Sequence, residues 1–235
     1  MQYQNSFRRY ELKYLLTPEQ KAQVLAAMEG HMALDKYGRT TIRNLYLDTD
    51  SYRLIRRSIE KPAYKEKLRI RSYSKAAPGQ PVFVELKKKY KGVVYKRRLA
   101  MPEQDALDWL LSGDSPPDSQ IGREIDYFRS YYGNLCPKVF LSYDRDAYYC
   151  EKQKDFRVTF DDNILCRREN LSLGTDPWGE PILESGLVLM EIKTAGGMPL
   201  WMSDVLTREH IYKTSYSKYG TAYEKLIFKE VFAHV

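Results

Sequence analysis

The sequence predicts an α+β fold in which antiparallel strands form the larger part and a few helices pack against them. Three observations support this prediction. Several short segments alternate apolar and charged residues at the period-two spacing of a strand. Five other segments carry the start or stop signals of helices. The 235 residues include 20 tyrosines, a residue type that is enriched in strands.

Five helices are expected from their end signals. The clearest begins after Thr17, because Thr17, Pro18 and Gln20 supply an N-cap, a proline in the first turn and a capping-box partner. Gly30 is a plausible end for that helix. The other four helices are expected at 102–111, 123–132, 199–208 and 217–232. Loops are expected at 76–81, 112–120 and 174–180, where Gly, Pro and Ser gather.

The expected strands share one pattern: one face is apolar and the other carries charged residues. The segment at 9–14 places Glu11 and Lys13 on the same face as Arg9. The segment at 67–71 places Lys67, Arg69 and Arg71 on one face. The same alternation recurs at 84–87, 95–99, 143–145, 157–161 and 190–193.

Two architectures explain this alternation. In an open antiparallel sheet the charged face would be solvated. In a closed eight-stranded barrel it would line an interior wide enough for one small ligand. The repeated Lys and Arg, with only isolated Glu among them, favour the barrel, because like charges on neighbouring strands repel unless an anion lies between them. In that case Leu12, Ile70, Leu86 and Ile192 would pack outward against the helices, although the alternation alone does not separate the two geometries.

Composition narrows the function further. The chain has 38 Lys and Arg against 31 Asp and Glu, and the net charge of +7 indicates an anionic partner. No run of about 18 apolar residues is present, so no membrane segment is expected. The three cysteines and three histidines have no metal-ligand or triad spacing, and the cysteine usage favours a cytoplasmic location. Nucleic acid is disfavoured, because Tyr10 and Tyr14 lie on the face opposite Glu11 and Lys13, where bases could not stack beside the cations.

Eight short motifs occur in one order along the chain and resemble a known family. They lie at 10–14, 45–49, 67–73, 84–87, 142–145, 157–161, 190–193 and 216–219. Together they resemble the VTC domain, the polyphosphate polymerase branch of the triphosphate tunnel metalloenzyme (CYTH-like) superfamily, from about residue 7 to residue 228. We therefore expect one VTC-like domain over residues 1–235.

The resemblance implies both a fold and an activity. The fold would be an eight-stranded antiparallel β-barrel tunnel with surrounding helices. The activity would be transfer of the terminal phosphoryl group of ATP onto a polyphosphate chain, with Mn²⁺ or Mg²⁺ as the metal. Hydrolysis of inorganic or nucleoside triphosphate by the same fold, and non-catalytic binding of polyphosphate, are the alternatives. The sequence predicts no particular oligomeric state.

The resemblance also assigns roles to individual residues. The catalytic set is Lys13, Arg69, Arg71 and Lys193, and the metal ligand is Glu191. The substrate-binding set is Glu11, Lys67, Glu85, Lys87, Lys96, Arg98, Tyr143, Arg145, Arg157, Ser217 and Lys218. Lys193, Lys87 and Lys218 would line the path of the acceptor chain. Tyr46 and Asp48 either contact a ligand or shape the turn after their strand.

One difference from the wider superfamily helps to decide which branch of it this chain resembles. Its first strand often reads Glu-x-Glu-x-Lys, whereas this chain has Arg9, Glu11 and Lys13. One carboxylate fewer and one cation more favour the polymerase over a two-metal triphosphatase or a cyclase.

Overall fold

The computed structural model describes residues 10–91 and 93–228, so Arg9 and the end of the helix expected at 217–232 lie outside the described residues. Two compact units are present. Unit 1 contains residues 10–41, 143–164 and 183–217, and unit 2 contains the described residues of 42–142, 165–182 and 218–228. Strands β3 (Thr40–Thr49), β7 (Leu135–Tyr149) and β8 (Arg157–Arg167) contribute residues to both units.

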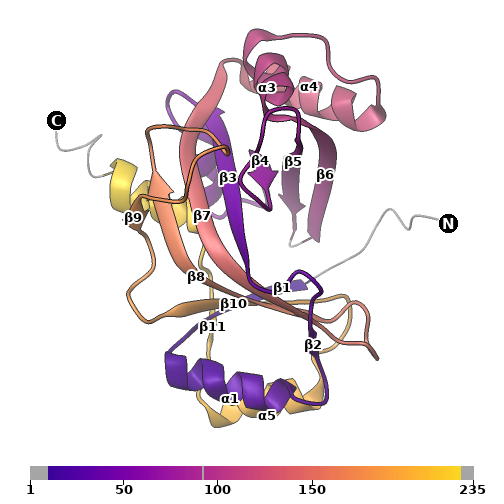
Figure 1. Ribbon diagram of the computed structural model, residues 1–235, viewed down its shortest axis with the longest axis vertical. Helices are drawn as coiled ribbons and strands as arrows, with labels where there is room; N and C mark the ends of the chain where they lie inside the picture. Colours follow the sequence, from indigo (N-terminus) through magenta and orange to yellow (C-terminus); the bar gives the residue numbers. More distant parts are fainter. Residues whose placement is uncertain (1–9, 92, 229–235) are drawn as a thin grey trace. The chain divides into compact units, whose positions relative to one another are not determined.

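Unit 1 is an antiparallel sheet covered on one face by two helices. Its strands follow the order β11 (Lys213–Thr214), β1 (Tyr10–Leu16), β10 (Val188–Thr194), β8 and β7, and β2 (Ala33–Leu34) pairs with β7. Helices α1 (Pro18–Met28) and α5 (Leu200–Arg208) lie side by side (Figure 1). Helix α1 begins as predicted, because Thr17 and Gln20 form a complete capping box.

The core of unit 1 is built by the apolar faces of its strands. Ile192 is fully buried and lies in one cluster with Val24 of α1 and Met202 of α5. Leu12 packs against the same cluster, and Tyr14 is buried in it. The predicted packing of the apolar alternates against helices is therefore confirmed for Leu12 and Ile192.

Unit 2 contains the strand order β7, β3, β4 (Tyr64–Ser72), β5 (Pro81–Tyr90) and β6 (Val93–Pro102), and β9 (Glu180–Pro181) pairs with β8. Its helices are α2 (Arg53–Ile59), α3 (Glu103–Leu107), α4 (Gln120–Tyr132) and α6 (Lys218–Ala222). Helices α3 and α6 continue into single π-helical segments, Asp108–Ser112 and Tyr223–Ile227. The predicted helices at 102–111, 123–132 and 199–208, and the start of the one at 217–232, are confirmed to within a few residues.

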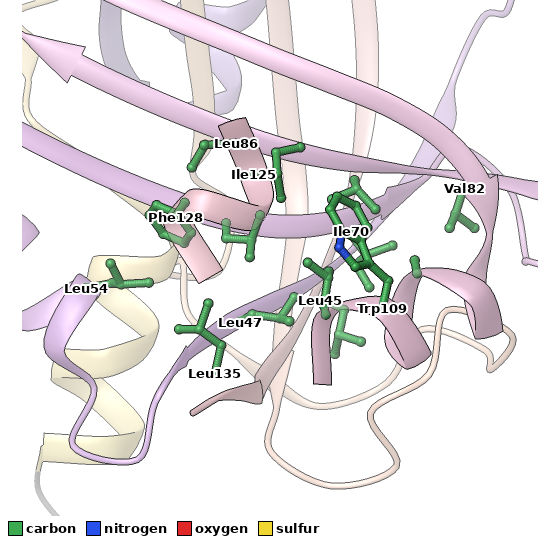
Figure 2. Packing of buried hydrophobic residues seen from close by; sticks show 14 of the residues in the cluster. Leu45, Leu47, Leu54, Ile70, Val82, Leu86, Trp109, Ile125, Phe128 and Leu135 are labelled. Atoms are coloured by element: carbon green, nitrogen blue, oxygen red, sulfur yellow. The ribbon is translucent and has the colours of Figure 1, made fainter. Parts of the chain in front are cut away.

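The core of unit 2 packs one face of the sheet against α3 and α4. Ile70 of β4 and Leu86 of β5 are fully buried in a cluster with Trp109 and Phe128 (Figure 2). The outward packing predicted for Ile70 and Leu86 is confirmed. The opposite face of the same strands carries the charged residues, because side chains alternate between the two faces.

The closed eight-stranded barrel is wrong. The described strands number eleven. Nine of them form one hydrogen-bonded path whose ends, β11 and β6, do not pair with each other among the described residues, and β2 and β9 pair beside this path with β7 and β8. Three of the strands, β2, β9 and β11, are only two residues long and carry no periodic pattern. The alternation predicts which face is charged but not which edge strands pair.

Helix α2 has no start signal in the sequence. Its N-cap residue, Tyr52, has a φ of 56° and no side-chain capping bond. The carboxylate of Asp48 caps it instead, accepting the backbone N–H groups of Leu54 and Ile55 at 2.9 and 3.0 Å. No helix of the described residues is long and apolar enough to cross a membrane.

Candidate functional site

The charged face of unit 2 is assembled by the register of β4, β5 and β6. Arg69, Glu85 and Arg98 lie directly opposite one another on the three strands. The adjacent row on the same face consists of Lys67, Lys87 and Lys96. With Arg71 two residues beyond Arg69, these rows place six cations and one carboxylate on one face, a formal excess of five positive charges.

Glu85 lies at the centre of these cations, and only 1% of its side chain is exposed. Its Oε2 accepts Nε and Nη2 of Arg69 at 2.9 and 2.7 Å, and Arg71 Nε lies 3.9 Å from the same oxygen. Its Oε1 lies 2.6 Å from Lys96 Nζ and 2.8 Å from Arg98 Nε, and it also contacts Arg98 Nη2. We name Arg69, Arg71, Glu85, Lys96 and Arg98 the Glu85 cluster.

Neutral groups hold the two arginines of β4 in place. Arg71 Nε donates to Asn44 Oδ1 at 2.8 Å, and Asn44 Nδ2 donates to the carbonyl of Leu141 at 3.0 Å. Arg69 Nη1 donates to the Tyr46 hydroxyl at 3.1 Å. Two bonds from one arginine to one carboxylate, plus a third to a tyrosine, fix the plane of the Arg69 guanidinium.

The cluster changes the ionisation of its own members. Burial alone would raise the pKa of Glu85, but Arg69, Arg71 and Lys96 hold that pKa well below its usual range. Burial lowers the pKa of Lys96 to about 7; Glu85 opposes this shift, whereas Arg69 and Arg98 reinforce it. The cluster therefore keeps its carboxylate ionised and contains a lysine that titrates near neutral pH.

A series of side-chain contacts within unit 2 connects the Glu85 cluster to helix α6. The ring of Tyr46 stacks on the ring of Tyr219, with centroids 4.6 Å apart, and the Tyr219 hydroxyl donates to Asp48 Oδ2 at 3.0 Å. Lys218, the residue before Tyr219, is 8% exposed. Tyr46 and Asp48 thus have different roles. Asp48 shapes the turn into α2, and Tyr46 holds Arg69.

Unit 1 presents a different charged face, centred on Glu191 of β10. Lys13 and Thr159 lie directly opposite Glu191 on the neighbouring strands β1 and β8. Lys13 Nζ lies 3.3 Å from Glu191 Oε1, and Lys193 Nζ lies 3.3 Å from Oε2. Lys13 also lies 3.6 Å from Glu11 Oε1.

Arg145 joins this group through Asp161, which ends the motif at 157–161 but has no predicted role in the site. Asp161, whose side chain is fully buried, accepts Nε and Nη2 of Arg145, both at 2.6 Å. Arg145 Nη2 lies 3.6 Å from Glu191 Oε2, and its guanidinium lies 5.1 Å from the Tyr143 ring centre. Burial by itself would lower the pKa of Arg145. Tyr143 and Asp161 favour the charged guanidinium, and the pKa of Arg145 is therefore raised well above its ordinary value. We name Glu11, Lys13, Arg145, Asp161, Glu191 and Lys193 the Glu191 cluster.

The Glu191 cluster suits a metal that arrives with its substrate. The described residues contain no group of three or more Asp, Glu, His or Cys that could hold a metal by itself. Glu11 and Glu191 both approach Lys13, and carboxylate oxygens are the ligands that a hard cation prefers. One or two carboxylates completed by phosphate oxygens and water are the usual donor set of Mg²⁺. The oxygen donors of this cluster therefore fit a divalent cation whose remaining ligands are not protein side chains.

Most of the predicted site residues fall into these two groups. Lys67 and Lys87 lie in register beside the Glu85 cluster, and Arg157 lies opposite Lys193 on the face of the Glu191 cluster. Ser217 follows Tyr216, whose carbonyl accepts Lys13 Nζ at 3.0 Å. Asp161 and Asn44 were missed, because their partners lie on other strands and no local spacing reveals them.

One polar group near Glu191 is unusual. The hydroxyl Oγ1 of Thr159 is buried and has no hydrogen-bond partner in the described part of the chain. Thr159 itself is 7% exposed and faces the same side of the sheet as Glu191. A buried hydroxyl without a partner costs stability.

Comparison with known proteins identifies the class. The family model described as the VTC domain matches residues 8–227, so the chain belongs to the VTC domain family. The predicted family is confirmed. No curated protein matches the chain.

Solved structures support the fold. The chain is similar to a "putative adenylate cyclase" from Bacillus halodurans, with 16% identity, a TM-score of 0.54, and coverage of 89% of this chain and 95% of that one. It is also similar to a "putative adenylate cyclase" from Vibrio parahaemolyticus, with 11% identity, a TM-score of 0.45, and coverage of 98% and 99%. The protein PH1819 from Pyrococcus horikoshii OT3 matches with 14% identity, a TM-score of 0.45, and coverage of 92% and 99%. At this identity, the first of these shows a shared fold.

Proposed function

We propose that this chain transfers the terminal phosphoryl group of ATP onto a polyphosphate chain, with Mn²⁺ or Mg²⁺. The observation that carries the proposal is the face of β4, β5 and β6, where six cations surround one carboxylate. An excess of five positive charges on one face of three strands suits a ligand with several negative charges, and arginine forks match phosphate oxygens. Membership of the VTC family supports phosphate as that ligand.

The two clusters receive different roles because their charges differ. The Glu85 cluster with Lys67 and Lys87 is strongly cationic and would bind the triphosphate. The Glu191 cluster has carboxylates and cations in equal number, three of each, so it is the part that can supply a metal ligand. A divalent metal held there would supply positive charge to a phosphate group. Residues 8–227 would then act as one functional domain.

In the proposed reaction an ionised oxygen of the acceptor phosphate attacks the γ-phosphorus of ATP. A new P–O bond forms, the bond to the bridging β–γ oxygen breaks, and ADP leaves with that electron pair. The acceptor oxygen is already deprotonated, so the chain needs no general base. Its residues contribute alignment and positive charge, which are the main requirements of phosphoryl transfer.

The test is incubation of the purified chain with ATP and Mn²⁺, followed by gel analysis for acid-labile polymer. We expect polymer from the wild type and strongly reduced polymer from Arg71→Ala in unit 2 and from Glu191→Gln in unit 1. Arg123→Ala is the matched control, because Arg123 is 66% exposed on α4 and its ion-pair partner, Asp118, is also exposed. Polymer at the normal rate from either site variant would refute the assignment.

A second candidate function is hydrolysis of inorganic or nucleoside triphosphate, with water as the acceptor. The approach of Glu11 and Glu191 to one lysine favours it, because paired carboxylates suit a metal-dependent hydrolase. The same assay distinguishes the two, since hydrolysis yields free phosphate and no polymer. Tight binding of polyphosphate with neither product would indicate a binding domain.

A further inference from the structure

The carboxylate of Glu85 is bound by the cations of this face. Its two oxygens contact Arg69, Lys96 and Arg98 within 3 Å, and Arg71 lies at 3.9 Å. With 1% of its side chain exposed, the carboxylate has little freedom to leave. The cations proposed to hold phosphate are therefore already bound to an anion that belongs to the chain.

We infer that Glu85 is a positioning residue that also lowers the affinity of the surrounding cations for phosphate. This inference rests on the proposed function of the same face. The first effect of Glu85 is geometric: two bonds to Arg69 and the bonds to Arg98 hold both guanidinium planes ready for the substrate. Its second effect is electrostatic, because its negative charge repels phosphate and offsets one of the surrounding cations. Glu85 is not a substrate-binding residue in this scheme, since a carboxylate repels phosphate oxygens.

The electrostatic effect has a use in polymer synthesis. A chain that lengthens must move past the cations after each transfer, and cations that hold it too tightly would slow that movement. A carboxylate among these cations competes for the same donors and lowers the affinity for the phosphate groups nearest to it. Glu85 would therefore both help to align the phosphates and ease release of the product.

The matched experiment compares Glu85→Gln with Glu124→Gln. Glu124 also binds an arginine of β6, Arg97, at 2.7 Å, but residue 97 points to the opposite face from Arg98. Binding of inorganic tripolyphosphate is measured by calorimetry without ATP, so no turnover is needed, and at pH 5.5, where Lys96 carries its charge in the free wild type. We expect Glu85→Gln to bind tripolyphosphate about tenfold more tightly than the wild type, because one unit of repulsion a few ångströms away is removed. We expect Glu124→Gln to bind like the wild type.

Turnover should fall in this variant although its affinity for phosphate rises. For Glu85→Gln with ATP, we expect KM to fall and kcat to fall as well, because the phosphates are held more tightly and aligned less well. A purely structural role for Glu85 would weaken binding and would not lower KM. Binding that is unchanged or weaker in Glu85→Gln therefore overturns the inference and leaves the proposed function standing.

The remaining outcomes are also decisive. A wild-type chain that does not bind tripolyphosphate overturns the proposed function and this inference together. Glu85→Gln could fail to fold because the cations around residue 85 would repel one another. In that case Arg98→Gln is compared with the double variant Glu85→Gln/Arg98→Gln, because both of these chains have one cation fewer in the cluster. The double variant should bind tripolyphosphate more tightly than Arg98→Gln, and equal or weaker binding contradicts the inference.

Discussion

Asp161 and Arg145 form a paired contact in which one carboxylate accepts two guanidinium nitrogens, Nε and Nη2, each at 2.6 Å. Asp161 is fully buried, and Arg145 is 15% exposed. Arg145 also approaches Glu191, so Asp161 determines where this arginine lies relative to the proposed metal ligand. The pair has a counterpart in the Glu85 cluster, where one carboxylate accepts hydrogen bonds from Arg69 and Arg98.

Loss of this carboxylate should destabilise the fold. Asp161→Asn leaves Arg145 largely buried with an incomplete partner, and breaking a buried ion pair costs about 3 kcal/mol. The free energy of unfolding, measured by urea denaturation, should fall by that order. Asp118→Asn is the control, because the Asp118–Arg123 pair is exposed and its loss should have no measurable effect. Equal stability of Asp161→Asn and the wild type would show that the contact is not formed in solution.

Lys96 should take up a proton when phosphate binds. Its pKa is lowered to about 7, so at pH 8 the free chain holds Lys96 mostly neutral. A bound anion favours the charged form and raises that pKa, and the complex therefore gains about one proton. Calorimetry of tripolyphosphate binding at pH 8, in buffers of different ionisation enthalpy, measures this uptake.

The control for that titration is Lys96→Arg, which stays charged at every pH used. The variant should show smaller proton uptake than the wild type at pH 8. Both chains should show the same uptake at pH 5.5, where Lys96 is already charged in the free wild type. Identical proton uptake at pH 8 would mean that Lys96 does not titrate near neutrality.

Removal of the unpartnered hydroxyl at Thr159 should stabilise the free chain. Thr159→Val keeps the shape of the side chain and deletes a buried Oγ1 that has no partner among the described residues, so the free energy of unfolding should rise by about 1 kcal/mol. The matched control is Thr41→Val, which deletes a hydroxyl that donates to Asp144 at 2.7 Å and should destabilise instead. Destabilisation by both variants would indicate that Thr159 Oγ1 has a partner in solution.

Much of this fold follows from local patterns in the sequence. Helix α1 was predictable because its capping box lies within four residues, at Thr17–Gln20. Helix α2 was not, because its cap is Asp48, which reaches the N–H groups of residues six and seven positions later. Closure of the sheet was predicted wrongly, because a period-two alternation describes each strand alone and carries no information about which edges pair.

The same distinction applies to the site. The charged face of each strand was predictable from spacing two residues apart, as with Arg69 and Arg71. The central position of Glu85 was not, because it depends on the register that places Arg69 and Arg98 on either side of it. Asp161 was missed for the same reason, since its arginine lies on another strand.

A crystal structure of the chain with tripolyphosphate is the direct test of the proposed phosphate site. We expect phosphate oxygens within hydrogen-bond distance of Arg69 and Arg71, with Glu85 still bound to Arg98. Tripolyphosphate bound elsewhere on the chain, with Arg69 and Arg71 free of it at saturating ligand, would contradict the assignment of this face as the phosphate site.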